Sequence, residues 1–268
     1  MAQDEPAARW SASSSYPDTG SGTVQLSADV HRVPPDDIAA VPLSALKFRA
    51  LTAADLEEIK ALHAEWFPVR YDDAFYSSTV DGEYTSIAAT HEFNVVDESG
   101  FSYRKELFLG MIVFTNSSWH DSESADAILG STWSCRKRDL AYVFTFGVID
   151  EYRRKGLARN LLRQAIEHLE TWQRQVQAIY LHVIAFNESA MRLYESEGFL
   201  QIQHKSDFYH IAGQSYDAYL YARYLNDGKP PLTWRMQQTA SSWWQWWSDA
   251  LRRAVWMRRQ TTGPPVQA

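Results

Sequence analysis

Residues 153–158 read Arg-Arg-Lys-Gly-Leu-Ala and lie between two segments of different periodicity. Residues 140–148 are apolar and aromatic, which is typical of a buried strand, whereas apolar residues recur at helical spacing from Leu157 to Trp172. At a turn from strand to helix, successive backbone N–H groups and the positive end of the helix dipole attract phosphate. A glycine there, Gly156, lets the main chain approach such an anion closely. The stretch therefore predicts a pyrophosphate-binding loop.

A second strand and helix follow the first pair. Residues 178–184 predict a strand, Asn187 is suited to cap the helix after it, and Gly198 is suited to end that helix. The Arg-x-x-Gly-x-Ala loop, with its flanking strand and helix and this second pair, resembles the signature of the GNAT superfamily of acetyl-CoA-dependent N-acetyltransferases. The resemblance implies acetyl-CoA as cosubstrate, with its pyrophosphate on the loop.

The remaining periodicities predict strands on either side of this centre. They lie at residues 46–51, 84–90 and 106–115 before it, and at 199–206 and 215–225 after it. Thr52 caps a helix that ends at Pro68. Two polar stretches, 91–105 and 116–139, are interpreted as long insertions. This order predicts an α/β (α+β) GNAT fold, a mixed, mostly antiparallel sheet of about seven strands with helices on both faces.

Composition argues against several classes of protein. The net charge of −7 and the pI near 5.6 argue against a nucleic-acid binder, which normally carries a basic face. Cys135 is the single cysteine and the histidines lack ligand-like spacing, so we expect neither a disulfide framework nor a metal site. No apolar run approaches the length of a membrane span and the N-terminus lacks a signal sequence, so catalysis is expected to face the cytosol.

The chain divides by composition into four parts. Residues 1–43 are rich in Ser, Pro, Asp and Gly and are expected to be a disordered tail. Residues 44–228 are the expected catalytic domain. Residues 229–260 are expected to form an amphipathic helical tail, followed by a disordered end at 261–268.

The predicted amphipathic tail has an unusual composition. Residues 232–260 hold six of the eleven tryptophans and five arginines against one aspartate. On a helical wheel the apolar residues share one face and the arginines lie largely off it. Tryptophan favours the headgroup level and arginine is drawn to anionic lipid, so residues 232–259 predict binding to an anionic membrane surface. The alternative is a helix that docks its tryptophan face on the catalytic domain.

Five further motifs sharpen the resemblance. They are Phe-Pro-Val-x-Tyr at 67–71, a tyrosine in the strand 140–148, Tyr-Leu-His-Val at 180–183, the aromatic pair 208–209, and Gly-x-Pro-Pro-x-Thr at 228–233. Together they are similar to protein N-terminal acetyltransferases of the membrane-associated NatF type, with the NatE catalytic subunit as near neighbour. The resemblance spans residues 46–259. It implies acetylation of the α-amine of Met-initiated proteins, in particular transmembrane proteins with cytosolic N-termini, at the cytosolic face of the Golgi membrane. An oligomer is possible but not required.

The chemistry of acetyl transfer to an amine needs a proton acceptor. An α-amine has a pKa near 8, so only about a tenth of it is neutral at pH 7. The thioester is already activated, so direct attack needs a general base, an oxyanion donor and positioning. Tyr142 and His182 are titratable groups on the central predicted strands, and the resemblance implies that they are the pair of general bases, acting through ordered water. Either residue could instead be a packing residue of its strand.

The resemblance also implies the remaining site residues. The cofactor would contact Phe146, Gly147, Val148, Arg154, Lys155, Gly156, Leu157, Ala158, Arg159, Asn187 and Tyr194, with Tyr194 as donor to the departing thiolate. The initiator methionine would meet the apolar wall Phe67, Pro68 and Val69 above a floor at Phe144, while Tyr71 and Tyr209 would hydrogen-bond the peptide backbone. Three residues depart from the pattern: Arg70 stands where an acid is expected, Phe208 replaces a tyrosine, and Ala158 replaces a glycine.

Two other functions stay open. The GNAT fold also serves acetylation of lysine side chains and small amines, so the fold alone does not decide the substrate. A lysine ε-amine, with a pKa near 10.4, is harder to deprotonate and needs a different slot. The second alternative is a membrane-binding scaffold with an inactive GNAT domain, against which the intact Tyr142, His182, Asn187 and phosphate loop argue.

Overall fold

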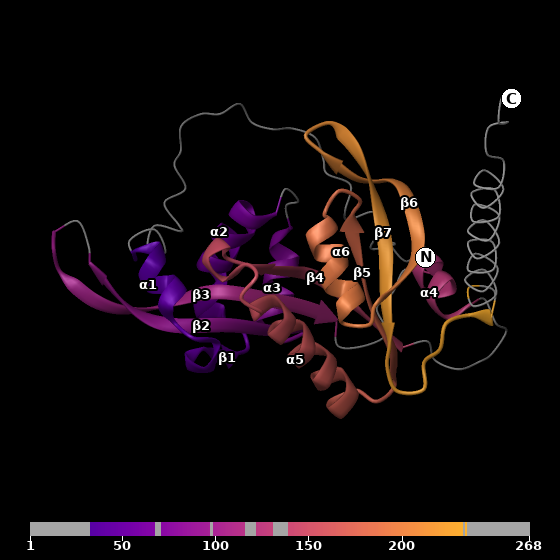
Figure 1. The fold of residues 1–268 in the computed structure, drawn as a ribbon, viewed down its shortest axis with the longest axis horizontal. Helices are drawn as coiled ribbons and strands as arrows, with labels where there is room; N and C mark the ends of the chain where they lie inside the picture. Colours follow the sequence, from indigo (N-terminus) through magenta and orange to yellow (C-terminus); the bar gives the residue numbers. More distant parts are fainter. Residues whose placement is uncertain are drawn as a thin grey trace, which may run out of the picture. The chain divides into compact units, whose positions relative to one another are not determined.

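In the part of the chain that the computed structural model describes, residues 33–67, 71–96, 99–115, 122–130, 139–232 and 234, seven strands form one mixed sheet (Figure 1). The strands are β1 Lys47–Arg49, β2 Tyr84–Val96, β3 Ser102–Thr115, β4 Asp139–Val148, β5 Val176–Ile184, β6 Leu200–Ile211 and β7 Gln214–Tyr224. They lie in the order β1-β2-β3-β4-β5-β7-β6, and every neighbouring pair is antiparallel except β4 and β5. The predicted mixed, mostly antiparallel sheet is confirmed.

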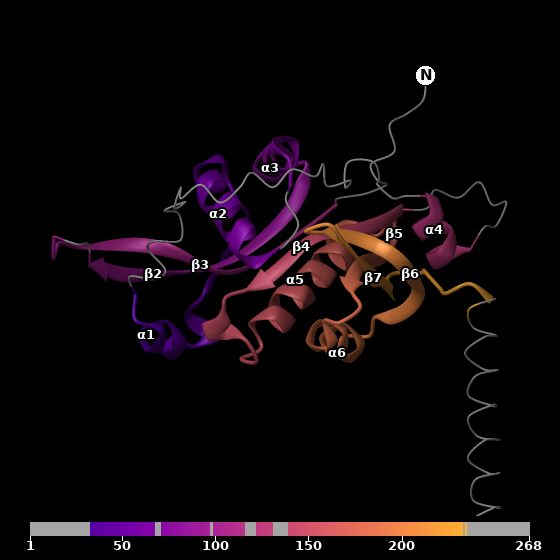
Figure 2. The same ribbon diagram turned by 90° about the horizontal axis from the view of Figure 1, so that it is seen from above.

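Helices cover both faces of this sheet, as predicted (Figure 2). The helices are α1 Pro35–Ala40, α2 Leu56–Trp66, α3 Asp73–Val80, α4 Ser122–Leu129, α5 Leu157–Trp172 and α6 Glu188–Ser196, with short 3-10 turns η3 Leu43–Ala45, η4 Ala53–Asp55 and η5 Asp150–Tyr152. α2 and α3 lie on one face, and α1, α5 and α6 lie on the other. Each face therefore has its own hydrophobic core.

The longest of these helices, α5, buries the apolar residues whose helical spacing predicted it. Its residues Leu157, Leu161, Leu162, Ala165 and Leu169 are fully buried against the sheet. Burying one leucine side chain stabilises a fold by about 1.5–3 kcal/mol, so this stripe fixes α5 on the sheet. The start of α5 is thereby held directly after β4, where the phosphate loop was predicted.

The sheet opens between its two parallel strands. β4 and β5 pair only from Asp139 to Tyr142 on the first strand and from Val176 to Tyr180 on the second. Beyond these residues β4 continues in register with β3 alone, and β5 with β7 alone. Unpaired edges of this kind leave main-chain groups available to a ligand. Phe146, Gly147 and Val148, which the resemblance places along the cofactor, lie in the part of β4 that does not pair with β5.

The predicted disordered tail is wrong for its last part. Residues 33–43 contain α1 and the beginning of η3, and Val33 and Ile38 are buried in the core under α5. Val33 and Ile38 are isolated apolar residues in a polar, proline-containing stretch, so composition concealed them. Residues 1–32 and 261–268 lie outside the described residues.

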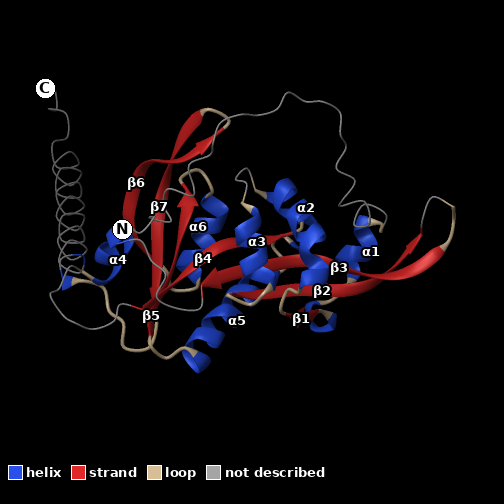
Figure 3. Cartoon of the chain, turned by 180° about the vertical axis from the view of Figure 1, so that it is seen from behind, coloured by secondary structure: helices blue, strands red, loops and turns tan. Residues whose placement is uncertain are grey.

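The prediction of a long polar insertion at 91–105 is also wrong. The β2–β3 ladder continues without a loop to the pair Val96 and Ser102, and the two strands extend as an arm beyond the body of the sheet (Figure 3). Phe93 and Val95 are buried, while Glu92, Asn94 and Val96, which alternate with them, are exposed. This is a period of two, but charged residues on the outer face made the stretch look like a loop.

The second predicted insertion, 116–139, contains the helix α4. Ala125 and Ile128 of α4 pack against Leu140 of β4 and Tyr180 of β5. Residues 116–121 and 131–138 are not among those described. The same holds for nearly all of the predicted amphipathic tail, since beyond residue 232 only residue 234 is described. Across the described ranges, we find no helix with both the length and the apolar content needed to cross a bilayer.

Candidate active site

Tyr142 and His182 meet where β4 and β5 separate. The Nδ1 atom of His182 lies 3.4 Å from the Tyr142 hydroxyl oxygen, and the ring centroids are 5.8 Å apart. Tyr142 is the last residue of β4 that pairs with β5, and His182 lies two residues beyond Tyr180, its pairing partner. Two titratable groups from two strands are therefore in contact at the opening of the sheet.

An aromatic lid covers the histidine. The ring of Phe208 stacks on His182 at 4.2 Å between centroids and 22° between planes. A break in the β6–β7 register between Lys205 and Tyr209 brings Phe208 there, and Asp207 in this break has a φ of 52°. The Asp207 N–H donates to Oδ1 of Asp217 at 3.0 Å, which stabilises the bend.

Two tyrosine hydroxyls hydrogen-bond the main chain near the opening. Tyr71 donates to the carbonyl of Phe144 at 2.9 Å, and Tyr209 donates to the carbonyl of His182 at 3.2 Å. Burial raises the pKa of both tyrosines, so both hydroxyls stay protonated at neutral pH. The two residues predicted to hold a peptide backbone are thus hydrogen-bonded to the two strands that part, Tyr71 to β4 and Tyr209 to β5.

The phosphate loop, defined as residues 153–158, forms the predicted turn from β4 through η5 into α5. Arg154 and Gly156 have φ values of 62° and 91°, and Gly156 is the N-cap of α5. The N–H groups of Leu157, Ala158 and Arg159 fall in the first turn of the helix, where no intrahelical acceptor exists. Main-chain donors and the helix dipole therefore point out of this end of α5.

The basic side chains of the loop and of the first turn of α5 are held by the protein in different ways. The Lys155 ammonium donates to the carbonyl of Ala39 at 2.6 Å. Arg159 forms an ion pair of 2.7 Å with Glu197, whereas Arg154 is exposed. Of the predicted anion-binding side chains, Lys155 and Arg159 thus bind protein atoms, and the main chain is the more available donor.

The other predicted cofactor residues line the opened edge of β4. Phe146, Gly147 and Val148 pair with β3, and the Phe146 ring lies 6.4 Å from that of Tyr194 on α6. Tyr194 is buried, and burial raises its pKa. The Asn187 side chain caps α6 by accepting from the N–H of Ala190 at 3.2 Å.

Two of the predicted peptide-binding residues, Phe67 at the end of α2 and Phe144 on β4, pack among aromatic rings. A Cβ built on Gly147 would come within 2.8 Å of Trp66 and 3.1 Å of Phe67, so this part of β4 lies directly under the two aromatic rings. Phe144 packs 4.5 Å from Tyr84 and 5.2 Å from Tyr142 between ring centroids. Pro68, Val69 and Arg70 fall outside the described residues.

Sequence reasoning missed a cluster around His63. The imidazole is 1% exposed and has four aromatic neighbours, which we call the aromatic cage. They are Phe67, Tyr71, Phe75 and Tyr76, at 5.4, 5.2, 6.0 and 5.6 Å between centroids. Burial lowers the pKa of His63 to about 4, so the ring is neutral at pH 7. The spacing of Ile59, Leu62, His63 and Trp66 on one helix face was the available signal.

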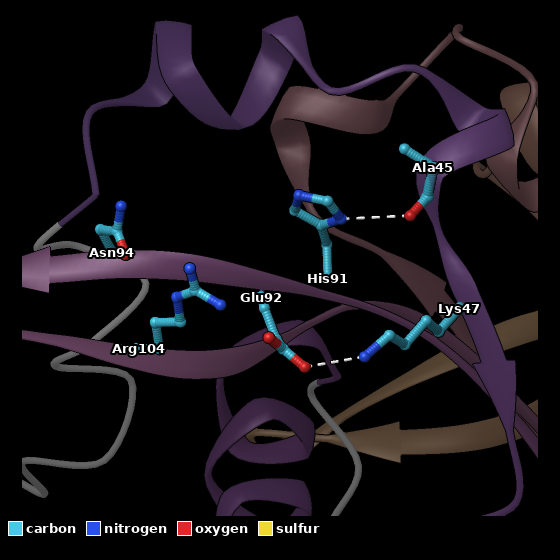
Figure 4. A pocket seen from close by; sticks show the side chains of 6 residues that line it. All are labelled: Ala45, Lys47, His91, Glu92, Asn94 and Arg104. Atoms are coloured by element: carbon cyan, nitrogen blue, oxygen red, sulfur yellow. Dashed lines mark hydrogen bonds and ion pairs between the residues drawn. The ribbon is translucent and has the colours of Figure 1, made fainter.

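Two open pockets lie away from this site. One, of about 340 Å³, is lined by residues of β1, β2 and β3 near the arm and includes the 2.7 Å ion pair between Lys47 and Glu92 (Figure 4). The other, of about 300 Å³, lies beside α6, β6 and β7. Among the residues that the structure describes, no cluster of three potential metal ligands occurs, and the sequence predicted no metal site.

Comparison with known proteins identifies related chains. The model of the acetyltransferase (GNAT) family matches residues 56–199. The N-alpha-acetyltransferase 60 of Danio rerio is 33% identical over 201 residues, covering 74% of this chain and 77% of that protein. The histone acetyltransferase MCC1 of Arabidopsis thaliana is 29% identical over 189 residues, covering 70% of this chain and 73% of that protein. Among solved structures, Arabidopsis thaliana NAA60 in complex with acetyl-CoA has a TM-score of 0.57 and 30% identity, covering 68% and 99%.

Proposed function

Because the chain belongs to the acetyltransferase (GNAT) family, we propose that it transfers the acetyl group of acetyl-CoA to the N-terminal α-amine of proteins that begin with methionine. One observation carries this proposal beyond the family. His182 and Tyr142 are in contact, 3.4 Å apart, at the point where β4 and β5 separate. This contact supports a proton acceptor beside the only two strands of the described sheet that run parallel and then part.

The residues present fit acetyl-CoA. The positive φ of Gly156 and the unsatisfied N–H groups at the start of α5 suit the pyrophosphate, and the unpaired edge of Phe146, Gly147 and Val148 suits the amides of the pantetheine arm. Acetyl-CoA, when bound, supplies an activated thioester carbonyl, whose C–S bond breaks as the bond to the amine nitrogen forms. The solved relative that binds acetyl-CoA is 30% identical to this chain.

In the proposed mechanism, Tyr142 and His182 remove the proton that the α-amine loses, directly or through a water molecule. A neutral imidazole accepts this proton, and the phenol in contact with it keeps the ring oriented. Tyr194, buried beside Phe146, donates a proton or a hydrogen bond to the leaving sulfur. No covalent enzyme intermediate is required, because the thioester is already activated.

The acceptor methionine is proposed to bind at the end of α2. Phe67 and Phe144 supply apolar surface, and Tyr71 and Tyr209 supply hydroxyls beside the two strands that part. Apolar surface of this kind favours a long unbranched thioether side chain. As the family resemblance implies, we expect the substrates of this chain to be transmembrane proteins with cytosolic N-termini.

A second candidate is acetylation of lysine side chains. It is favoured by the 29% identity with a protein named a histone acetyltransferase. A lysine ε-amine needs a base able to remove a proton from a group with a pKa near 10.4, and it enters as a long extended chain. An inactive membrane-binding scaffold is the third possibility.

We further propose that residues 232–259 bind an anionic membrane surface, and that the protein works at the cytosolic face of the Golgi membrane. The support is the composition of this stretch, with six tryptophans and five arginines against one aspartate in residues 232–260. Liposome sedimentation tests it: a form ending at Gly228 should lose binding to anionic vesicles. Equal sedimentation of the full chain and this form would refute the anchor.

The test of the proposed activity is a peptide library with free α-amines and internal lysines that varies at the first two residues. We expect thiol release from acetyl-CoA together with acetylation at the α-amine of Met-initiated peptides. Modification of internal lysines in preference to the α-amine would support the second candidate. Binding of acetyl-CoA without turnover on any peptide would support the scaffold.

A further inference from the structure

We propose that Asp217 is a positioning residue for His182, because its carboxylate closes the irregular part of β6 that places Phe208 on the imidazole ring. This inference rests on the proposed function, which gives His182 its role as a base. We call residues 206–208 the β6 bulge. Asp217 lies on β7, the strand between β6 and β5, and hydrogen-bonds residues on both sides (Figure 1).

The β6 bulge sets three residues opposite one. The last β6–β7 pair before the bulge and the first pair after it are Lys205–Ala218 and Tyr209–Tyr216. Three residues of β6 therefore face a single residue of β7, Asp217. Extra residues in one strand of an antiparallel pair make that strand bend. Asp207, in the middle of the β6 bulge, has the left-handed φ of 52°.

This bend explains how Phe208 reaches His182. Because β7 lies between β6 and β5, two strand spacings, about 9.5 Å, separate β6 from β5 in a regular sheet. The centroids of the Phe208 and His182 rings are nevertheless 4.2 Å apart. The next residue, Tyr209, donates to the His182 carbonyl at 3.2 Å. The β6 bulge thus brings two consecutive aromatic side chains across β7 onto the proposed base.

Both carboxylate oxygens of Asp217 contact β6. Oδ1 accepts the N–H of Asp207 at 3.0 Å, and Oδ2 lies 2.9 Å from Nε2 of His204. The main-chain carbonyl of Asp217 accepts the N–H of Ala185 at 2.9 Å, directly after the end of β5. One residue therefore joins the β6 bulge to the strand that carries His182.

Of the two carboxylate contacts, the one with the Asp207 N–H is decisive. The extra residues of a bulge are left out of the ladder, so their main-chain donors need another acceptor. Residues other than glycine also seldom adopt a φ of 52°, so this conformation needs support. The side chains of His204 and Asp217 are 45% and 43% exposed, and contacts between exposed charges contribute little. The acceptor oxygen of Asp217 therefore matters more than its charge.

The position of Phe208 fixes the plane of the imidazole. The ring planes of Phe208 and His182 lie 22° apart, and in this orientation Nδ1 of His182 is 3.4 Å from the Tyr142 hydroxyl. Phe208 is itself 38% exposed, so its place depends on the bent backbone rather than on enclosure by other side chains. A displacement of about 1 Å in a site can cost on the order of 100-fold in rate, so loss of the bend should lower kcat.

The first test is the proton NMR spectrum of the His182 ring in the full chain without ligand. A stacked aromatic ring shifts the protons beneath it upfield, and Phe208→Leu removes that shift. Asp217→Leu should move the His182 signals downfield toward their position in Phe208→Leu. Asp217→Asn, which keeps an acceptor oxygen, should leave them at the wild-type position. The signals are assigned by their absence in His182→Gln.

Two NMR results would overturn the proposal, and neither depends on any activity. One is a wild-type position of the His182 signals in Asp217→Leu. The other is a downfield shift in Asp217→Asn as large as in Asp217→Leu, because the charge would then matter and the acceptor oxygen would not.

The second test is steady-state kinetics with a Met-initiated peptide. Asp217→Leu should lower kcat about 10- to 100-fold and leave the acetyl-CoA KM unchanged. Asp217→Asn and His204→Leu should keep kcat within about threefold of the wild-type value. Asp227→Leu, which changes an exposed aspartate just after β7, is the matched control and should leave kcat unchanged. An equal fall in the control would overturn the assignment.

A third test bends the strand without changing Asp217. Asp207→Val places a β-branched residue at the positive φ and should lower kcat, whereas Asp207→Gly should not. Ala212→Val is the matched control, because Ala212 has the same φ of 52° in the β6–β7 turn. An equal loss of kcat at both positions would mean that the hairpin as a whole is destabilised, and the role of the β6 bulge would be wrong.

A double-mutant comparison separates action through Phe208 from other effects. In a Phe208→Leu background, Asp217→Leu should lower kcat much less than it does in the wild type. Equal falls in both backgrounds would mean that Asp217 does not act through Phe208. If the wild-type protein acetylates no α-amine, the proposed function fails, and the NMR result still decides whether Asp217 positions Phe208 on His182.

Discussion

The phosphate loop and the aromatic cage hold their proposed ligands by different means. The loop is a run of consecutive residues in which main-chain N–H groups, the left-handed Gly156 and the start of α5 provide the donors. The cage brings side chains from α2 and α3 onto β4, and its one imidazole is buried among four aromatic rings. The loop therefore depends on backbone conformation, and the cage depends on side-chain volume.

This difference predicts which substitutions each region tolerates. Side chains of the loop and of the first turn of α5 should be replaceable with little effect on acetyl-CoA binding, since Lys155 and Arg159 already bind protein atoms. In the cage, even a conservative change alters a closed set of contacts. Variants of the two regions should therefore separate in kinetics, with the loop affecting acetyl-CoA and the cage affecting the peptide.

The largest effect is expected at the two proposed general bases, which belong to neither region. Tyr142→Phe combined with His182→Ala should lower kcat by about 10²- to 10⁴-fold, because no group is left to accept the proton. Acetyl-CoA affinity, measured by calorimetry, should stay at the wild-type value, since the loop is intact. Unchanged acetylation by the double variant would contradict the mechanism.

The cage should give the protein an acid-sensitive stability. His63 has a pKa of about 4 in the folded state, against about 6.5 when unfolded, so the unfolded chain binds the extra proton first. The free energy of unfolding is therefore highest above pH 6.5. It falls by about 3 kcal/mol in all as the pH falls toward 4. The titratable groups that face the ring, Tyr71 and Tyr76, both have pKa values raised by burial and stay neutral there.

Urea unfolding at several pH values measures this effect. The free energy of unfolding of wild type and of His63→Leu should converge or cross as the pH falls from 6.5 to 4, because the leucine cannot be protonated. Parallel pH profiles of the two proteins would show that His63 is not the acid-sensitive group.

Gly147 tests the contact of β4 with the end of α2. Its Cβ in Gly147→Ala would lie 2.8 Å from Trp66 and 3.1 Å from Phe67, so the rings must shift. We expect a loss of about 1–3 kcal/mol in the free energy of unfolding, as for other overpacked sites, and a higher peptide KM. Adding Trp66→Phe should recover part of both, because it removes the ring atoms that clash. Strictly additive losses would argue against the contact.

The smallest effect is expected from Gly156→Ala. The positive φ of 91° strains any side chain, by roughly 1–2 kcal/mol, while the nearest atom to the new Cβ, on Leu43, is 3.7 Å away and does not clash. We expect the acetyl-CoA KM to rise up to about tenfold and the peptide KM to stay constant. Gly213→Ala is the matched control, since its φ is 76° in the β6–β7 turn. A rise in acetyl-CoA KM for both variants would point to general instability instead.

Much of the centre of the fold could be predicted from local sequence. β4, the loop, α5, β5 and α6 follow one another with strong periodicities and clear caps, and the structure has them within two residues of the prediction. The contact of Tyr142 with His182 could be expected because neighbouring parallel strands bring corresponding positions together. Local signals sufficed where the site is built from consecutive elements.

The rest of the site depends on contacts that local patterns do not encode. α3 was missed although Asp72 caps it, accepting from the N–H of Phe75 at 2.8 Å. The bonds of Tyr71 to β4 and of Tyr209 to β5 join residues far apart in the chain. His63 was set aside because a single histidine carries no periodicity of its own.

Two hydrogen bonds link the segment around α1 to η5 and the phosphate loop, and they bear on how the protein is made. The Lys155 ammonium and the Tyr152 hydroxyl bind carbonyls of Ala39 and Val41, which precede them by 116 and 111 residues. During translation, at about 5–20 residues per second, the early segment therefore waits roughly 6–23 seconds for its partners. In a nascent chain stalled before residue 150, we expect proteases to cleave the segment around α1. In a nascent chain that has been synthesised beyond α5, we expect the same segment to be protected.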